Sequence, residues 1–283
     1  MRGRSFNNWE GSYLALCEDV LRHGYRESSR AGDVYCLPGL SQTISLPAQN
    51  QFPLLTTRRM FVAGILGEAA AFLRGSTSNG NFLRFGCKYW TPNARAAYPG
   101  LEDLPDDALP LGPIYGAQWR NFNGQGVDQL DAARRMIVSD PHSRRIIVTA
   151  WNPLQTGLMC LPPCHVMFQF HVMGDELHLT VYMRSVDLCL GLPSDIVLYY
   201  LILALMAYDT RMPIGSLTFQ FGNAHIYAAH VQQLEEQLGR TVGEPPVFNL
   251  IGSAGRFIDN FAPTDIMFHS YNPQEKITYE LFA

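Results

Sequence analysis

Apolar residues recur every three to four positions in two stretches of the N-terminal third of the chain. The first stretch, residues 9–24, ends at Gly24, and the second, residues 60–75, ends at Gly75. This spacing is typical of amphipathic helices, and glycine commonly ends them. A single acidic residue, Glu68, lies inside the otherwise apolar second stretch. We therefore predict two helices, the second carrying a carboxylate on an apolar surface.

After residue 140 the pattern changes to short runs of β-branched and aromatic residues separated by turn residues, which is typical of strands. Strands are predicted over residues 144–152, 166–174, 176–185 and 215–227, followed by a helix over residues 228–238. Residues 91–112 are rich in Pro, Asp and Ala and predict a surface excursion. Because helices and strands are interspersed without regular βαβ alternation, we expect a single α+β domain.

The longest apolar run, residues 196–207, is preceded by Asp195. The run is too short to cross a bilayer, which needs about 20 apolar residues, so we predict a buried core helix. Burying an unpaired carboxylate next to it would cost several kcal/mol. Asp195 must therefore have a partner.

The composition narrows the function further. The chain has 283 residues, 47% of them hydrophobic, and a formal net charge of −4. A negative charge argues against binding a nucleic-acid duplex, which requires a positive field. Six cysteines are scattered without CxxC spacing, and no apolar segment opens the chain. We expect a reduced, cytoplasmic protein without a zinc site and without a membrane anchor.

The sequence around Cys164 suits a catalytic nucleophile. Cys164 follows two prolines, which fix the backbone, and directly precedes His165. The alternative is that Cys164 is buried and inert, as most structural cysteines are.

Two pairs of residues suit a phosphate monoester. Arg144 and Arg145 begin one predicted strand, and Arg184 and Ser185 end another. Guanidinium groups and a hydroxyl can bind phosphate oxygens together. Alone, each pair is more often a solvated surface charge.

Other candidates are single polar groups in apolar surroundings. His225 and Tyr227 are two apart on a predicted strand, so they share one face and can bind a common hydroxyl. Glu68 would have a raised pKa suited to proton transfer if it is buried. Trp90 can stack on a flat ring, although a tryptophan in the core is the more usual case.

The order of these motifs resembles that of thymidylate synthases and their relatives, the pyrimidine nucleotide 5-hydroxymethylases. The resemblance rests on LPPCHVMFQF (161–170), RSVDLCLGLPSDI (184–196) and GNAHIY (222–227), and on QFPLLTTRR, GEAAAFLRG, LGPIYGAQWR and DPHSRRIIVTAWN elsewhere. It implies one catalytic domain over residues 1–283, with a large mixed sheet flanked by helices and lying at a homodimer interface. It also implies that each site binds a pyrimidine nucleotide and 5,10-methylenetetrahydrofolate, without a metal.

The resemblance also assigns roles. Cys164 would add to C6 of the pyrimidine, Glu68 would organise proton transfers, and Tyr115 would help to remove the C5 proton. The phosphate would be held by Arg30, Arg184 and Ser185, with Arg144 and Arg145 reaching in from the other subunit. The sugar hydroxyl would be bound by His225 and Tyr227, and the folate by Trp90, Asp187 and the chain end at Ala283. Nearby arginines would favour the Cys164 thiolate.

Asp195 departs from the synthase pattern, which has asparagine here to pair with uracil. A carboxylate accepts a hydrogen bond from the cytosine amino group and can share a proton with N3. Sharing that proton would also draw electron density from C6 and assist attack by the thiolate. A site built for one hydrogen-bond pattern rejects the other by ~10⁴. We therefore predict dCMP as the substrate; a synthase that still uses dUMP through a protonated Asp195 is the alternative.

Two further positions resemble deoxycytidylate hydroxymethylases: Met183 before Arg184, and Phe282 before the terminal alanine. They favour 5-hydroxymethyl-dCMP, formed when water rather than hydride reaches the exocyclic methylene. Because Trp90, Leu161 and His165 match synthases, methylation of dCMP remains an alternative, as does the use of CMP.

Two other function classes compete with this one. Cys164 and His165 could form a thiol hydrolase dyad, which requires the imidazole to orient toward the sulfur. The chain could also bind nucleotides without turnover, but its retention of Cys164 and Glu68 argues against that. The prediction is a cytoplasmic homodimeric transferase, located in a host cell if a bacteriophage encodes it.

Overall fold

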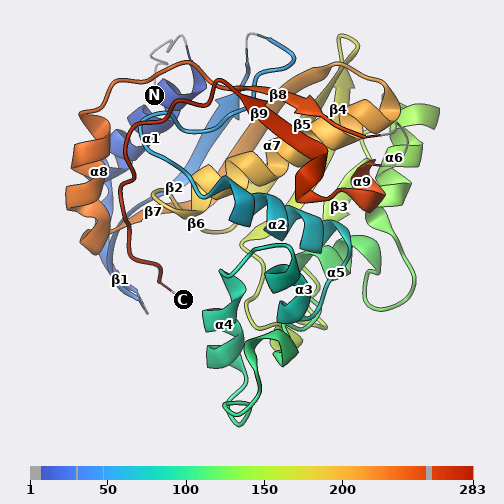
Figure 1. The fold of residues 1–283 in the computed structure, drawn as a ribbon, viewed down its shortest axis with the longest axis horizontal. Coiled ribbons are helices and arrows are strands. Elements are labelled where there is room, and N and C mark those ends of the chain that lie inside the picture. Colours follow the sequence, from blue (N-terminus) through green and yellow to red (C-terminus); the bar gives the residue numbers. More distant parts are fainter. Residues whose placement is uncertain (1–7, 30, 47, 253–256, 283) are drawn as a thin grey trace.

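The computed structural model describes residues 8–29, 31–46, 48–252 and 257–282. Its centre is a sheet that, among these residues, has seven strands in the order β1-β2-β7-β5-β4-β3, with β6 paired to β7 (Figure 1). The strands are β1 Tyr25–Ser29, β2 Gly32–Ile44, β3 Ile147–Thr149, β4 His165–Met173, β5 Glu176–Met183, β6 Val186–Asp187 and β7 Ile214–Tyr227. Strand β7 runs parallel to β5 and β6, and the other pairs are antiparallel, so the sheet is mixed.

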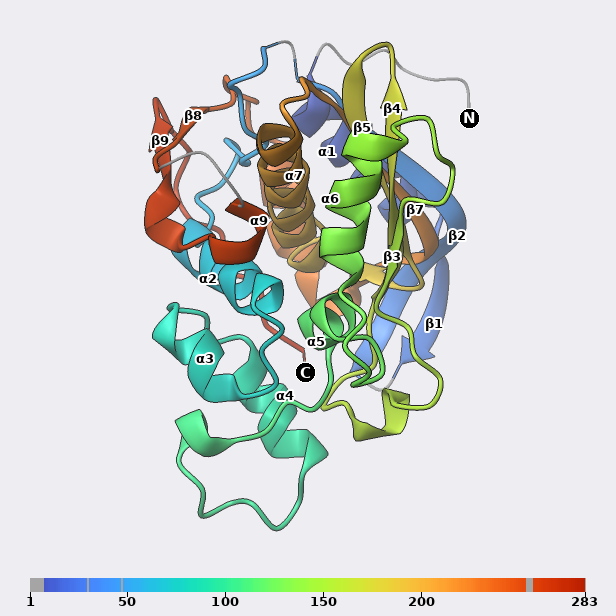
Figure 2. The same cartoon turned by 90° about the vertical axis from the view of Figure 1, so that its right-hand side faces the viewer.

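The described helices lie on one side of this sheet, some in contact with its strands and others packed on those helices (Figure 2). They are α1 Trp9–His23, α2 Val62–Leu73, α3 Asn79–Arg84, α4 Trp90–Ala97, α5 Tyr115–Arg120, α6 Gln129–Ser139, α7 Gly191–Thr210, α8 Val231–Leu238 and α9 Phe257–Asn260. Figure 2 shows α6 and α7 against the sheet and α2 beyond them, while no described helix covers the opposite face. A small sheet of β8 Val247–Leu250 and β9 Ile266–His269 lies apart from the main one. The predicted α+β class is confirmed.

Helix α7 forms the core. It is long and apolar enough to cross a membrane by length and composition alone, but 78% of its most apolar stretch is buried inside the protein. Every residue from Ile196 to Ala207 is at most 2% exposed, which confirms the predicted core helix. The helix starts earlier than the apolar run suggests, because Pro193 is tolerated in a first turn. Asp195 consequently lies within α7 rather than ahead of it.

Several predicted bounds need correction. Helix α2 ends at Leu73, and the chain turns away through the positive φ of Gly75 (68°). The strand predicted over residues 144–152 shrinks to Ile147–Thr149, because both arginines at its start lie in a loop.

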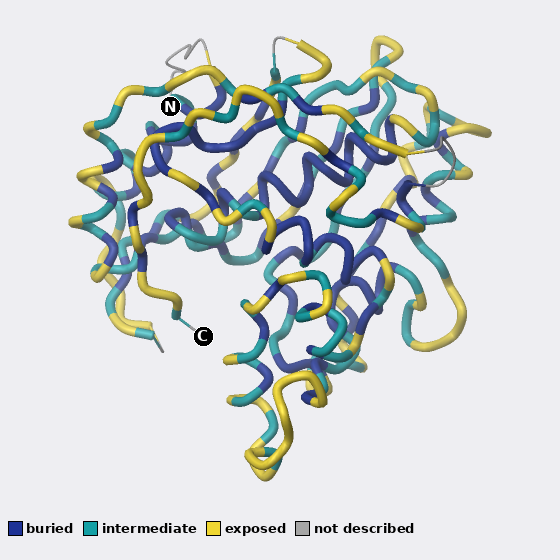
Figure 3. The backbone as a smooth tube through the Cα atoms, in the orientation of Figure 1, coloured by how far each residue is buried: buried dark blue, intermediate teal, exposed yellow. Residues whose placement is uncertain are grey.

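The predicted surface excursion is correct only in its middle. Most of the loop at residues 99–108 is exposed, as the yellow loop at the bottom of Figure 3 shows. Helix α4 occupies the start of the segment, while Leu109 and Leu111 at its end are fully buried. The segment therefore leaves the core and returns to it.

Candidate active site

A cavity of about 670 Å³ lies where α2, α4 and the start of α7 face the ends of β5, β6 and β7. Its lining contains most of the predicted functional residues: Glu68, Trp90, Tyr115, Cys164, Arg184, Ser185, Asp187, Asp195, His225 and Tyr227. These residues come from distant parts of the sequence. The fold therefore brings together groups that the sequence could connect only through motif order.

Cys164 lies partly exposed in the cavity, immediately before β4. The Nη2 of Arg184 is 3.7 Å from its sulfur, and the same guanidinium donates to the carbonyls of Pro162 and Pro163, both at 2.9 Å. The two prolines thus fix the cation beside the thiol. A cation so placed favours a thiolate over a neutral thiol.

Tyr115 supports the cysteine from the other side. Its hydroxyl accepts a hydrogen bond from the Cys164 backbone N–H at 2.8 Å. Burial, above all, raises the pKa of Tyr115 well above its ordinary value. The phenol therefore remains protonated and can still donate its O–H into the cavity.

Glu68 faces the cavity from α2 and accepts a hydrogen bond from the Trp90 indole N–H at 2.8 Å. Burial above all raises its pKa, with the Trp90 hydrogen bond opposing the shift and the charge of Asp195 adding to it, to a resulting value of about 7. A carboxyl group with such a pKa exchanges protons readily near neutrality. Trp90 is 6% exposed and packs edge-on against Phe72, so it belongs to the core and to the cavity wall.

Asp195 has a protein partner. Its Oδ1 lies 2.8 Å from Nε2 of His165, and the two residues are 9% and 8% exposed. Because a carboxylate only accepts, His165 donates through Nε2. His165 is therefore the partner that the buried Asp195 carboxylate requires. The contact uses Oδ1 and not Oδ2.

The orientation of His165 does not favour a hydrolase dyad. The ring is directed by Asp195, and its Nδ1 is buried with no hydrogen-bond partner in the described chain. The rings of Tyr115 and Tyr199 pack against it at 4.8 and 5.3 Å between centroids. A general base for Cys164 would need a ring nitrogen aimed at the sulfur.

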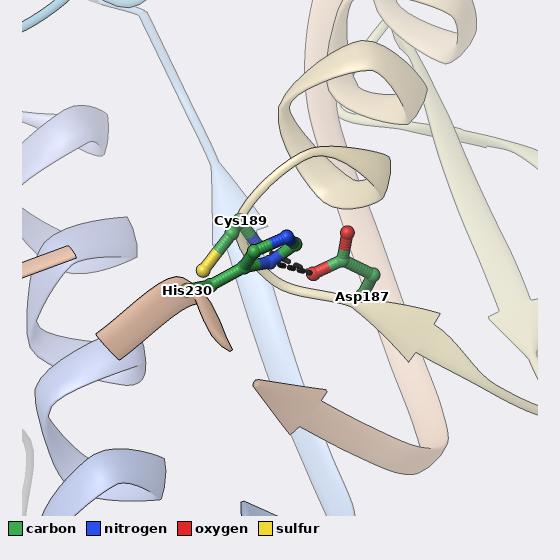
Figure 4. Close-up of side chains that lie close together, drawn as sticks. All are labelled: Asp187, Cys189 and His230. Carbon is green, nitrogen blue, oxygen red and sulfur yellow. Dashed lines mark hydrogen bonds and ion pairs between the residues drawn. The ribbon is translucent and has the colours of Figure 1, made fainter. Parts of the chain in front are cut away.

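Asp187 lies in a compact group with Cys189 and His230, whose potential ligand atoms all fall within 4.8 Å of one another (Figure 4). The group does not fit a metal site. The Asp187 carboxylate already accepts from the backbone N–H groups of Cys189 (2.9 Å) and Leu190 (3.2 Å). Burial raises the pKa of the Cys189 thiol well above its ordinary value, whereas a metal needs the thiolate.

His225 and Tyr227 lie on one face of β7, as predicted, with their ring centroids 5.2 Å apart. The Nδ1 of His225 is 3.2 Å from Oδ1 of Asn223. Burial lowers the pKa of His225, although Asp187 opposes the shift. A neutral imidazole and a phenol form a suitable pair for a sugar hydroxyl, since each can donate or accept.

Of the remaining predicted residues, two do not line the cavity and two fall outside the described residues. Arg144 and Arg145 are exposed in the loop before β3 and do not line the cavity. Arg30 and Ala283 fall outside the described residues.

Sequence reasoning gave no role to the segment 56–59, which also borders the cavity. Arg58 is 6% exposed, donates to the Cys189 carbonyl at 2.6 Å and lies over the Tyr279 ring. The segment is anchored by Glu10, which accepts from the backbone and hydroxyl groups of Thr56 and Thr57 at 2.6–3.0 Å. The TTRR run at residues 56–59 is the only sequence signal for this segment. Its anchor Glu10 has no local signal, because it lies 46 residues before Thr56.

Comparison with known proteins gives one consistent result. A family model described as "Thymidylate synthase" matches residues 11–283. A thymidylate synthase of Equine herpesvirus 2 is 37% identical, covering 96% of this chain and 98% of that protein. The human thymidylate synthase is 36% identical over 96% of this chain and 90% of its own length. "Thymidylate synthase 1/2" of Encephalitozoon cuniculi is 39% identical over 82% of each chain.

Proposed function

Because this chain belongs to the thymidylate synthase family, we propose that it transfers a one-carbon unit to C5 of dCMP and releases 5-hydroxymethyl-dCMP. The family is folate-dependent and uses methylenetetrahydrofolate as co-substrate. Its members are homodimers that bind a nucleotide. The proposal adds the choice of base, the product and the residues that act.

Asp195 is the observation that carries the choice of cytosine. The donor contact from His165 holds Oδ1, which leaves Oδ2 for a base. Cytosine offers an amino donor and an N3 that can share a proton with a carboxylate, whereas uracil offers a carbonyl that a carboxylate repels. Since the relatives named above are thymidylate synthases, this preference rests on Asp195 and not on them.

The proposed reaction begins at Cys164. Its thiolate, held beside Arg184, forms a bond to C6, and the electron pair of the 5,6 double bond moves to C5. The folate supplies the one-carbon unit, which becomes bonded to C5, and Trp90 and Asp187 would hold this co-substrate. Glu68 and the Tyr115 hydroxyl relay the C5 proton away.

Completion of the reaction requires water. After tetrahydrofolate leaves, hydroxide from water adds to the exocyclic methylene, and elimination of the Cys164 thiolate restores the 5,6 double bond. Lys276, Ile277, Tyr279 and Phe282 of the C-terminal segment line the cavity, so this segment is placed to govern which species enters.

Methylation of dCMP is the second candidate, and the resemblance of Trp90, Leu161 and His165 to synthases supports it. In that reaction hydride from the folate replaces water, and dihydrofolate forms. The two candidates separate on one measurement. Growth of dihydrofolate absorbance with dCMP would contradict the hydroxymethylase proposal, whereas a hydroxymethyl mass without dihydrofolate supports it.

The base preference is tested with dCMP, dUMP and CMP side by side. The substitution Asp195→Asn should shift the ratio of kcat/KM for dUMP to kcat/KM for dCMP by about 10³-fold or more in favour of dUMP. The reason is that mismatched hydrogen-bonding groups of the base and the site are buried without partners. Asp195→Ala is the matched control, which should lose turnover of both bases. Preference of the unaltered enzyme for dUMP would overturn the role of Asp195, and preference for CMP would overturn the deoxyribose assignment.

We also propose that residues 1–283 act as one cytoplasmic catalytic unit within a homodimer. The sheet face that no described helix covers carries the half-exposed side chains of Ile147 and Tyr182, each 43% exposed. An isologous dimer would bury such a face. Arg144 and Arg145 are exposed at its edge, where they can reach a second subunit's phosphate site.

A further inference from the structure

The C-terminal segment, residues 276–282, crosses the cavity without regular secondary structure; we call it the tail (Figure 1). Two aromatic rings of the tail, those of Tyr279 and Phe282, pack against two rings at the end of β7. These belong to Tyr227, the last residue of β7, and His230, three residues later. The Phe282 ring lies 4.5 Å from Tyr227 and 5.4 Å from His230. The tail thus packs on a residue of the proposed sugar site.

His230 also binds the tail backbone. It is fully buried, and its Nε2 lies 2.8 Å from the carbonyl oxygen of Glu280. A carbonyl only accepts, so Nε2 carries the proton and donates it. This bond therefore sets both the tautomer and the orientation of the ring.

The opposite edge of the same imidazole ring, which carries Nδ1, points toward Asp187. Its Nδ1 is 3.9 Å from Oδ1 of Asp187, an ion-pair contact that Figure 4 marks with a dashed line. This distance is beyond that of a hydrogen bond, and Nδ1 has no hydrogen-bond partner in the described chain. Nδ1 and Oδ1 face each other across this gap. Asp187 also accepts hydrogen bonds from the N–H groups of Cys189 and Leu190.

We propose that His230 is a positioning residue that couples the seating of the tail to the proposed sugar residue Tyr227 and the proposed folate residue Asp187. The His230 ring contacts all three. It donates to the Glu280 carbonyl of the tail, packs against the Tyr227 ring, and lies 3.9 Å from Asp187 at its Nδ1 edge. The seating geometry is independent of which base the enzyme uses. Only the kinetic consequence rests on the proposed function, through the roles given to Tyr227 and Asp187.

The coupling is tested by replacing the donor while keeping the ring. His230→Phe removes the Nε2–H and retains aromatic packing, whereas His230→Gln retains an N–H donor near the same place. Amide hydrogen exchange is measured on the tail and on α8 in the enzyme without ligands. We expect His230→Phe to speed exchange of the tail amides by about fivefold to tenfold, the effect of one net hydrogen bond, and His230→Gln to restore much of the protection.

Kinetics supply the second readout. His230→Phe should raise KM for methylenetetrahydrofolate by a similar factor while changing the KM for the nucleotide less, with His230→Gln again closer to the unaltered enzyme. Phe282→Ala removes the ring contact from the tail side and leaves the core intact. It should speed exchange in the tail and leave the α8 amides unchanged, which keeps the proposal testable if His230→Phe does not fold.

Unchanged tail exchange in both His230→Phe and Phe282→Ala would overturn the proposal, as would equal loss in His230→Gln and His230→Phe. Because exchange is measured without nucleotide, these outcomes are distinguishable from a failure of the dCMP assignment. That failure would appear only in the comparison of substrates.

Discussion

At the scale of single residues, the pairing of Asp195 with His165 has a thermodynamic consequence. Removing one member of a buried hydrogen-bonded pair leaves the polar group of the other unsatisfied and costs about 1–3 kcal/mol. His165→Leu should therefore lower the free energy of unfolding strongly when Asp195 is present and much less in the Asp195→Asn background. Urea unfolding of the four proteins in this double-mutant cycle measures the coupling. Additive effects would show that the 2.8 Å contact contributes nothing net.

The raised pKa of Glu68 makes stability depend on pH. Folding raises the pKa of this carboxyl from 4.5 to about 7, so the folded state resists its ionisation. The resulting penalty is absent below pH 4.5, grows between 4.5 and 7, and is complete above 7, where it reaches at most about 3 kcal/mol.

Glu68→Gln removes that ionisation. The variant should match the unaltered protein in urea unfolding at pH 4.5 and exceed its stability at pH 8, while losing turnover. A stability difference that does not change with pH would contradict the assigned pKa.

The nucleophile is tested by covalent trapping. A 5-fluoropyrimidine nucleotide lacks the C5 proton that must leave, so its complex with the folate should stop as an adduct on Cys164. Intact-protein mass spectrometry should show this adduct only when folate is present, and not in Cys164→Ala. Folate-independent labelling would instead favour simple thiol reactivity.

The individual residues differ in how far the sequence foretells them. Cys164 and Arg184 stand in distinctive motifs, and the cavity contains both. The pairing of Asp195 with His165 had no local signal, because 30 residues separate two side chains that meet only when α7 packs on the central sheet. The same holds for Arg58 and its contacts with the Cys189 carbonyl and Tyr279.

At the scale of elements, the close contact of α5 with α2 sets the position of the proton-transfer groups. Gly116 lies so near the backbone of Phe72 that a Cβ would overlap its carbonyl oxygen. Gly116 adjoins Tyr115, and Phe72 is one helical turn beyond Glu68. The missing side chain lets the two helices approach.

Gly116→Ala should therefore destabilise the protein by about 1–3 kcal/mol, as overpacking does, and reduce kcat by displacing Tyr115. The matched control is Gly157→Ala, where a Cβ would meet no atom within 4 Å and φ is ordinary. Urea midpoints and kcat of the two variants give the comparison. Equal stability of both would show that the helices can separate at little cost.

Elements with local periodicity were predictable, whereas those defined by distant pairing were not. Helix α1 followed from apolar spacing, α7 from a continuous apolar run, and β7 from its β-branched and aromatic residues. The pattern gave no signal for the β1–β2 hairpin, because its short strand β1 is exposed throughout and β2 depends on pairing with β7.

At the scale of the whole molecule, the proposed dimer makes each site depend on two chains. A subunit carrying Cys164→Ala and a subunit carrying Arg144→Ala with Arg145→Ala should each be inactive alone. In a mixed dimer, one of the two sites regains both an intact cysteine and intact arginines. Random mixing of equal amounts should restore roughly a quarter of the full activity, since half of the dimers are mixed.

Refolding the two variants together and assaying product against each variant refolded alone measures this recovery. No recovery on mixing would place the arginines outside the partner's site.

The register of the central sheet bears on how the protein is made. Strand β2 pairs residues 34–44 with residues 217–227 of β7, so a nascent chain leaving the ribosome exposes one edge of β2 until most of the polypeptide has been translated. During that interval β2 is a template for wrong association with neighbouring chains. More chaperone during expression should therefore raise the yield of active enzyme, measured as the specific activity of the soluble fraction.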